Sequence, residues 1–320
     1  MELKDRSILV TGGAGFIGSH LVDRLIPEKP GKLVVVDNLF LGKRSNLAEA
    51  FTKFPQLKLV VESVCDIDRM RQVVGDEKID VVFDMATIPL PASLERPDWA
   101  AEEIYRMMLV FCALCRQGLF KTLIHCSSSE AYGSAVRVPM DEDHPMMVET
   151  PYAAAKAAAD LLVRSYARTF NIDMAIIRPF NNYGPRQNEG SYAAIIPVVI
   201  RRILAGQPPV IFGDGEQTRD FLYVTDTVEG IVSAAKSDRM HGRTVNIASG
   251  REVTIHELIR QISRALDYTG EPIREPARPA DVRRHLADTR LAQAELGFKP
   301  AVPLEEGIRR TVAWYKTALQ

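Results

Sequence analysis

The sequence predicts an α/β protein, a doubly wound parallel sheet with a smaller C-terminal α/β domain. Short apolar runs alternate with segments of helical period through the first half of the 320-residue chain, and a repeated strand–helix–strand order is typical of parallel sheets. Several runs, such as KLVVVDN, are β-branched on both faces, as strands covered by helices on both sides require. After Pro179 the chain becomes rich in Asn, Gly, Pro and Arg, which indicates a loop and a change of domain.

The expected elements follow this order along the chain. Strands are expected within 7–12, 32–38, 57–64, 81–86, 122–128 and 174–180, and helices within 17–26, 70–74, 102–117 and 152–170. Later helices are expected within 195–206, 253–267 and 303–319. We place the first domain at residues 1–178 and the second mainly at 179–320. Segments around 222–248, a helix and a strand, are expected to return to the first domain.

Composition excludes several classes of function. A net charge of −1 with scattered Lys and Arg makes nucleic acid an unexpected partner. The chain enters its first strand directly and has no apolar run of membrane-spanning length, so we expect no signal peptide, no membrane association and a cytoplasmic location. The four cysteines, Cys65, Cys112, Cys115 and Cys126, are expected to be buried thiols, and we expect no metal site. His20 and His125 are expected to be packing residues.

A glycine-rich turn indicates a dinucleotide site. Gly12, Gly15 and Gly18 follow the first strand at GxxGxxG spacing and open a helix. The first glycine permits a tight turn, the second lets a pyrophosphate approach the backbone, and the third lets helix and strand pack closely. The helix N-terminus then offers unpaired N–H groups to phosphate. This is the pattern of a Rossmann-type domain, and the adjacent Phe16 and Ile17 belong to the same expected cofactor site.

Asp37 indicates which dinucleotide is bound. It ends the second strand, 19 residues after Gly18, where a carboxylate accepts hydrogen bonds from ribose hydroxyls and repels a 2′-phosphate. NAD is therefore favoured over NADP, although Lys43 and Arg44 follow closely. The expected cofactor contacts also include Asn38, Asp66, Ile67 and Ala86, and for Asp66 a helix-capping role is the alternative.

Tyr152 and Lys156 form a YxxxK pair, one turn apart on the same face of a helix. A phenol with an ordinary pKa of about 10 is a poor base at neutral pH. A neighbouring ammonium stabilises the phenolate and lowers that pKa into a working range. The pair follows a strand that ends in SSSEAYG, which presents Ser128 and Glu130 at the edge of the sheet.

These motifs resemble the extended short-chain dehydrogenases, specifically the NAD-dependent nucleotide-sugar epimerases and dehydratases. The resemblance covers TGGAGFIGSHL, SSSEAYG, YAAAK, RPFNNYGPRQ, IFGDGEQTRDFLYVTD and RPADVRRHLADTRLAQAELGF. It implies that Ser128, Tyr152 and Lys156 oxidise a sugar hydroxyl, usually at C4, with NAD regenerated in the cycle. It also implies that Ser128, Ser129, Asn181, Arg219, Arg278 and Asp281 bind a nucleotide sugar, most simply a UDP-sugar.

Glu130 leaves the second half of the reaction open. By resemblance, a Ser-Glu pair at Ser129 and Glu130 is found in dehydratases and decarboxylases. In a dehydratase the carboxylate removes the C5 proton once C4 is a ketone, whereas a β-keto acid with its carboxylate at C6 loses carbon dioxide instead. The remaining motifs are most similar to C4 epimerases, which need no acid or base at C5. C4 epimerisation of a UDP-hexose is favoured; a 4,6-dehydratase using Glu130 and a UDP-uronic acid decarboxylase are the alternatives. A catalytically silent protein that senses NAD is the remote alternative.

Two positions depart from the family pattern. Tyr105 stands where an Asn is usual, and DMATIPLPAS at 84–93 replaces the usual HLAA loop beside nicotinamide and sugar. The resemblance also implies a homodimer in which the helices within 102–117 and 152–170 pack with their mates as a four-helix bundle.

Overall fold

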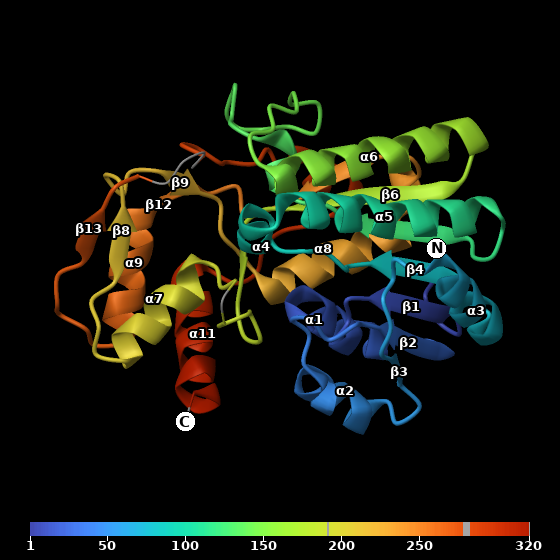
Figure 1. The fold of residues 1–320 in the computed structure, drawn as a ribbon, viewed down its shortest axis with the longest axis horizontal. Helices are drawn as coiled ribbons and strands as arrows, with labels where there is room; N and C mark the ends of the chain where they lie inside the picture. Colours follow the sequence, from blue (N-terminus) through green and yellow to red (C-terminus); the bar gives the residue numbers. More distant parts are fainter. Residues whose placement is uncertain (191, 278–281, 320) are drawn as a thin grey trace.

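A computed structural model describes residues 1–190, 192–277 and 282–319, and its central element is a seven-stranded parallel sheet (Figure 1). The strand order is β11-β6-β5-β4-β1-β2-β3, and every neighbouring pair is parallel. The doubly wound sheet predicted from the sequence is thereby confirmed. Its strands are β1 (Ser7–Thr11), β2 (Lys32–Val36), β3 (Lys58–Val60), β4 (Val81–Asp84), β5 (Thr122–Cys126), β6 (Asp173–Pro179) and β11 (Thr244–Ile247).

Helices cover both faces of this sheet (Figure 1). One face packs against α3 (Ile67–Glu77), α5 (Pro97–Arg116) and α6 (Pro151–Phe170), and the other against α1 (Phe16–Leu25), α8 (Val224–Lys236) and α10 (Arg290–Leu296). Shorter helical segments connect these elements. They are α2 (Ala48–Lys53), α4 (Leu90–Glu95) and the 3₁₀ turns η1 (Ile26–Glu28), η2 (Arg44–Leu47), η3 (Ser129–Tyr132) and η4 (Asp238–Met240).

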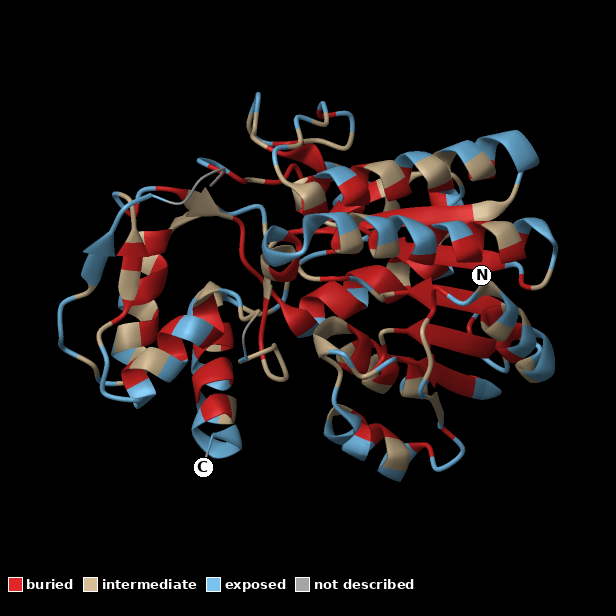
Figure 2. Cartoon of the chain, in the orientation of Figure 1, coloured by how far each residue is buried: buried red, intermediate tan, exposed pale blue. Residues whose placement is uncertain are grey.

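The core lies on both sides of the sheet because its strands are apolar on both faces. Leu9 packs on the side of α5 and α6, whereas Ile8 and Val10 pack on the side of α1 and α8. Figure 2 shows the central strands buried, while the two long helices alternate buried and exposed residues. The four cysteines are all buried free thiols, as the sequence predicts.

A second cluster of elements follows β6 and forms its own apolar core, to the left in Figure 1. It contains α7 (Ile195–Leu204), α9 (Ile255–Ala265) and α11 (Leu304–Ala318). Among the described residues after 181, three two-stranded sheets are found. They pair β7 (Asn182–Tyr183) with β10 (Leu222–Tyr223), β8 (Val210–Phe212) with β13 (Ile273–Glu275), and β9 (Thr218–Arg219) with β12 (Val253–Thr254).

The chain crosses between the two clusters more than once. Helix α8 packs against α1, and β11 pairs with β6 at the edge of the large sheet. Among the described residues, no helix combines the length and the apolar character needed to cross a bilayer.

Candidate functional site

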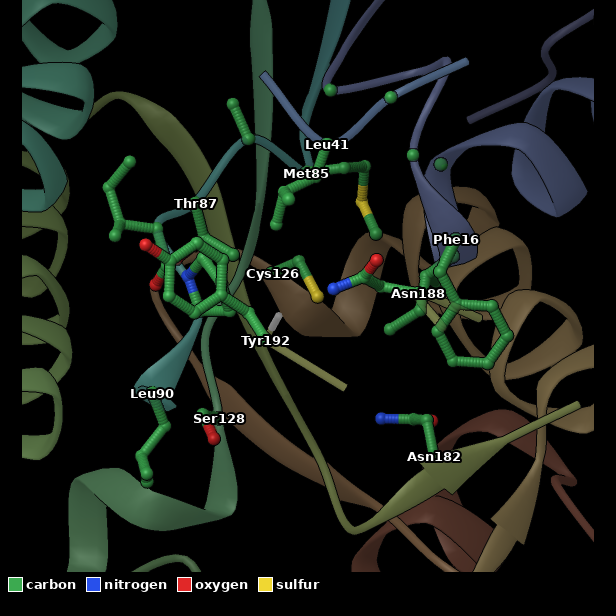
Figure 3. Close-up of a pocket in the computed structure, with 18 of the residues that line it drawn as sticks. Phe16, Leu41, Met85, Thr87, Leu90, Cys126, Ser128, Asn182, Asn188 and Tyr192 are labelled. Atoms are coloured by element: carbon green, nitrogen blue, oxygen red, sulfur yellow. The ribbon is translucent and has the colours of Figure 1, made fainter. Parts of the chain in front are cut away.

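A cavity of about 550 Å³ opens at the carboxyl ends of the parallel strands, between the large sheet and the second cluster. It lies where β1 and β4 are neighbours but their following helices cover opposite faces, the usual ligand site of such sheets. Figure 3 shows residues from several parts of the chain around it. Phe16 begins α1, Thr87 lies in the loop after β4, Ser128 follows β5, and Tyr192 lies in the loop before α7.

The glycine turn forms one wall and has no space for side chains. Gly12 has φ +59°, and a Cβ built on it would lie 2.9 Å from the Cα of Ala86. A Cβ on Gly18 would lie only 2.2 Å from the carbonyl oxygen of Gly12. No side chain of the described residues caps α1, whose first residues Phe16 and Ile17 line the cavity. A phosphate can therefore approach the helix N-terminus.

Asp37 lies at the end of β2 and lines the same cavity. Its carboxylate accepts hydrogen bonds from the backbone N–H groups of Ala14 (2.9 Å) and Leu39 (2.8 Å). Burial raises the pKa of Asp37, and these N–H groups oppose the rise. The nearby cations have other partners, since Lys43 pairs with Glu189 at 2.8 Å and Arg44 lies over the ring of Phe51.

The remaining predicted cofactor contacts divide into two groups. Asn38 and Ala86 line the cavity. Asp66 instead caps α3, because its carboxylate accepts hydrogen bonds from the N–H groups of Asp68 (3.1 Å) and Arg69 (3.0 Å). Neither Asp66 nor Ile67 is among the described lining residues; Glu62, Ser63 and Val64 of the preceding segment take that place.

The predicted catalytic residues are brought together at this cavity. Thr150 caps α6 and Pro151 begins it, which places Tyr152 and Lys156 in its first two turns. The buried Lys156 ammonium donates to the carbonyl of Cys126 at 2.9 Å. Burial raises the pKa of Tyr152, while the charge of Lys156 and a hydrogen bond with Ser128 oppose the rise. The pKa of Tyr152 is raised overall, so the lowering that the YxxxK pair predicts is not found in this structure, although Lys156 and Ser128 act in the predicted direction.

Glu130 also faces this cavity. Ser128 caps η3, because its Oγ accepts a hydrogen bond from the N–H of Glu130 at 3.2 Å, and the tight turn carries Ser129 and Glu130 along the wall. The charge of Glu130 raises the pKa of Tyr152, and both residues line the same cavity. A base is thus available on the same side of the cavity as the Tyr152–Lys156 pair.

The predicted substrate residues are only partly placed at the cavity. Asn181 lines it, and its amide nitrogen is buried. Arg219 is not among the described lining residues, and its guanidinium donates to the carbonyls of Thr218 (2.8 Å) and Val282 (2.6 Å). Arg278 and Asp281 lie outside the described residues. Tyr105 lies on α5 and is 40% exposed.

The unusual loop at 84–93, which the resemblance places beside nicotinamide and sugar, lines the cavity with an apolar surface from Met85 to Pro91, interrupted by Thr87. The structure also adds aromatic residues that the sequence did not single out. Phe40 and Tyr192, both at the cavity, have ring centroids 6.2 Å apart, and Phe40 lies edge-on to Trp99 at 5.6 Å. These rings are distant in sequence, so only folding brings them together.

The loop from β7 to α7, described at residues 184–190 and 192–194, is attached to the large sheet's side of the cavity. Arg186 pairs with Asp23 of α1 at 2.6 Å, and Glu189 pairs with Lys43. The hydroxyl of Tyr192 donates to Glu95 of α4 at 3.0 Å. The loop therefore crosses from one side of the cavity to the other.

Comparisons with known proteins agree with this geometry. A family model described as GDP-mannose 4,6 dehydratase matches residues 9–311. A putative UDP-glucose 4-epimerase of Methanocaldococcus jannaschii is 34% identical, with 97% of this chain and 98% of that protein covered. A dTDP-glucose 4,6-dehydratase of Actinoplanes sp. is also 34% identical, with 97% of each covered. A dTDP-glucose 4,6-dehydratase of Streptomyces venezuelae, solved with NAD bound, superposes with a TM-score of 0.91 at 29% identity over 97% of each chain.

Proposed function

The chain belongs to the family of NAD-dependent nucleotide-sugar epimerases and dehydratases, and from this premise we propose that it oxidises a nucleotide sugar at C4 and then rearranges the 4-keto sugar. One observation carries the first step. Ser128, Tyr152 and Lys156 come from β5 and α6 and meet at a single cavity next to the glycine turn. The residues expected to bind the cofactor and those expected to transfer a proton therefore line the same cavity.

The described residues fit NAD. The side-chain-free surface of Gly12 and Gly18 suits a pyrophosphate, and the buried carboxylate of Asp37 suits ribose hydroxyls. NAD supplies a hydride acceptor for C4 and later a hydride donor. The S. venezuelae relative, which carries NAD, supports this assignment.

The chain's own residues perform the proton chemistry in this proposal. Tyr152 accepts the proton of the C4 hydroxyl, and Ser128 holds the same oxygen as it becomes a ketone oxygen. Lys156, anchored by the Cys126 carbonyl, stabilises the phenolate with its positive charge. Return of hydride to the opposite face of C4, with Tyr152 giving the proton back, completes a C4 epimerisation.

C4 epimerisation of a UDP-hexose is our leading proposal for the second step, supported by the UDP-glucose 4-epimerase relative and by the epimerase-like motifs. One specific observation favours the alternatives. Glu130 lines the cavity near Tyr152, where it can remove the acidified C5 proton of a 4-keto sugar. A 6-hydroxyl would then leave as water, and return of hydride to C6 with a proton to C5 would give a 4-keto-6-deoxy sugar. A 4-keto uronic acid would instead keep its C5 hydrogen and lose C6 as carbon dioxide. The electrons of the broken bond would pass to the ketone, C5 would take up a proton, and hydride would return to C4 to give a pentose.

The deciding experiment is NMR of the protein with NAD and a panel of UDP- and dTDP-hexoses and UDP-uronic acids in deuterated water. An axial–equatorial change at C4 without deuterium at C5 would establish the epimerase. A 4-keto-6-deoxy product would establish the dehydratase, and a pentose formed with carbon dioxide the decarboxylase. NAD binding without any NADH formation or product across the panel would contradict the proposal and favour a sensing role.

The remaining site and assembly assignments are also proposals. We assign residues 1–178 and the returning segments around 222–248 to NAD, and mainly 179–320, including Asn181, Arg219, Arg278 and Asp281, to the nucleotide sugar. The outer faces of α5 and α6, which pack side by side, carry the exposed Leu109 (38%) and Leu161 (55%). This surface suits a homodimer through a four-helix bundle, and sedimentation of a Leu161→Arg variant tests it.

A further inference from the structure

A row of buried polar side chains crosses five neighbouring strands near their carboxyl ends, on the face covered by α5 and α6. In sheet order its members are Thr11 of β1, Asp84 of β4, His125 of β5, Arg178 of β6 and Asn246 of β11. The pairs Thr11–Asp84, Asp84–His125 and Arg178–Asn246 are in direct register. Asp160 of α6 lies between His125 and Arg178.

Three members of this row are ionisable, and with Asp160 they make four ionisable side chains that are each at most 2% exposed. His125 Nδ1 lies 2.9 Å from Asp84, and His125 Nε2 lies 3.5 Å from Asp160. Arg178 Nε donates to the other oxygen of Asp160 at 2.7 Å. His125 is buried, as a packing residue would be, and in addition its ring is hydrogen-bonded to the carboxylate of Asp84 and lies 3.5 Å from that of Asp160.

The row is in contact with the cavity wall at both ends. The Thr11 hydroxyl donates to Asp84 at 2.9 Å and accepts from the N–H groups of Met85 and Ala86 at 3.0 Å, which holds the loop beside Gly12. Near the other end of the row, at its fourth member, the Arg178 guanidinium lies 4.4 Å from the centroid of the Tyr132 ring. Tyr132 ends η3, the turn that carries Ser129 and Glu130.

The middle of the row is adjacent to the Tyr152–Lys156 pair. Asp160 follows Lys156 by one turn of α6, and Lys156 is anchored on the carbonyl of Cys126, the residue after His125. We propose that Asp84, His125, Asp160 and Arg178 form a charge-balanced positioning network that fixes α6 against β5 and leaves the positive charge of Lys156 directed at the Tyr152 phenol. Its catalytic meaning rests on the proposed function, but its effect on Tyr152 does not.

The charges support this balance. Burial alone would lower the pKa of His125, but the two carboxylates outweigh it and raise that pKa, so the imidazolium form is favoured. Burial would raise the pKa of Asp160, but Arg178 and His125 outweigh it and lower that pKa. The network as proposed sets the carboxylates of Asp84 and Asp160 against the guanidinium of Arg178 and a protonated His125, so that it carries no net charge. The charged groups that act on His125 are Asp84, Asp160 and Lys156. Asp84 also acts on the Cys112 thiol of α5, whose pKa is raised mainly by burial.

Loss of the His125 charge would leave the row with one excess negative charge behind Lys156. Tyr152 faces Lys156, Ser128, Glu130 and Cys126, and an added negative charge there disfavours the phenolate. We therefore expect His125→Asn to raise the pKa of Tyr152 by ~0.5–1 pH unit. The double variant Asp84→Asn/His125→Asn, which removes one anion together with the cation, should return it to the wild-type value.

The test is a pH titration of the phenolate absorbance in the near ultraviolet, with each protein compared with the same protein carrying Tyr152→Phe. This difference isolates Tyr152 and needs no substrate, so failure of the network and failure of the proposed reaction are distinguishable. His125→Gln, whose longer amide reaches toward Asp160, replaces His125→Asn should the latter fail to fold. In proteins that turn over, the pH dependence of NADH formation should move by the same amount.

A rise in the single variant that is reversed in the double variant supports the network. An unchanged Tyr152 pKa in the single variant, or an equal rise in both variants, would overturn it. A loss of melting temperature or of rate without a shift of the titration curve would show that the row is only structural, which also overturns the proposal.

Discussion

Substitution of Gly18 by Ala tests whether the close contact of α1 with the glycine turn is essential. The same substitution at Gly75 is the matched control, because both glycines lie within helices, α1 and α3. A Cβ on Gly75 would have no atom within 4 Å. A Cβ on Gly18 would lie 2.2 Å from the backbone oxygen of Gly12, so something must move by roughly 1 Å to reach an ordinary carbon–oxygen separation.

The structure gives the size and sign of both effects. Replacing Gly by Ala within a helix favours folding by about 0.8–1 kcal/mol, which is the full expectation for Gly75. At Gly18 the gain is offset by overpacking of about 1–3 kcal/mol. Displacing Gly12 also weakens the 3.0 Å hydrogen bond from Gly15 N to Gly12 O, worth about 1 kcal/mol. The net result is a destabilisation of ~1–3 kcal/mol.

Urea unfolding measures both stabilities, and calorimetric titration with NAD measures binding. We expect Gly75→Ala to unfold at a slightly higher urea concentration and to bind NAD as the wild type does. Gly18→Ala should unfold at a lower concentration and bind NAD at least ~10-fold more weakly, because Gly12 and Gly15 line the cavity. Wild-type stability and NAD affinity in Gly18→Ala would refute the reasoning from the contact.

Further predictions address the reaction and its pH dependence. Tyr152→Phe should slow NADH formation by ~10²-fold or more while NAD affinity in calorimetry stays unchanged; an unchanged rate would exclude Tyr152 as the proton acceptor. Glu130→Gln should leave a C4 epimerisation within about threefold but slow C5 proton removal by ~10²-fold, as deuterium exchange at C5 would report. His285 is buried and His20 is half-buried, and this loss of hydration lowers their pKa values to about 3 and about 4 respectively. These two histidines therefore leave the free energy of unfolding at its full value above pH ~6.5, the ordinary histidine pKa in the unfolded chain. Below that pH the unfolded chain is protonated first, and the free energy of unfolding falls by ~1.4 kcal/mol per histidine per pH unit. Urea unfolding between neutral pH and pH ~5 should show that slope, and His285→Gln should reduce it; an equal slope in the variant would contradict the assignment.

The sheet could be predicted because its signal is local. The apolar runs that end at Thr11, Asp37 and Ser128 become β1, β2 and β5 followed by the residues of the cavity wall. The glycine turn and the YxxxK pair are likewise encoded within a few residues. Asp66 marks the limit of this reasoning, because a carboxylate before a helix suits a cap as well as a ligand, and the neighbouring Glu62 carries no distinguishing pattern.

The buried charge network could not be predicted from local patterns. Asp84 and His125 are 41 residues apart, and each lies at the end of an apolar run that reads as an ordinary strand. Their pairing depends on the register of β4 against β5, which the sequence does not specify. One signal was available: Asp84, His125 and Arg178 are ionisable residues in the buried parts of strands that are otherwise mostly apolar, where an unpaired charge would be costly.

The attachment of the β7–α7 loop affects how long the electrons taken from the sugar stay in the cavity on the reduced dinucleotide. The Arg186–Asp23 and Lys43–Glu189 pairs and the contact of the Tyr192 ring with Phe40 tie the loop to the large sheet's side of the cavity, so we expect a bound dinucleotide to leave slowly. In the proposed chemistry the electrons taken from the sugar are needed again moments later by the same molecule. A slow exit suits that demand, since the reducing power stays with the sugar that supplied it and never enters the general pool of reduced nicotinamide. The rate at which bound NADH escapes would then set how often the 4-keto sugar is left without a hydride to complete the reaction.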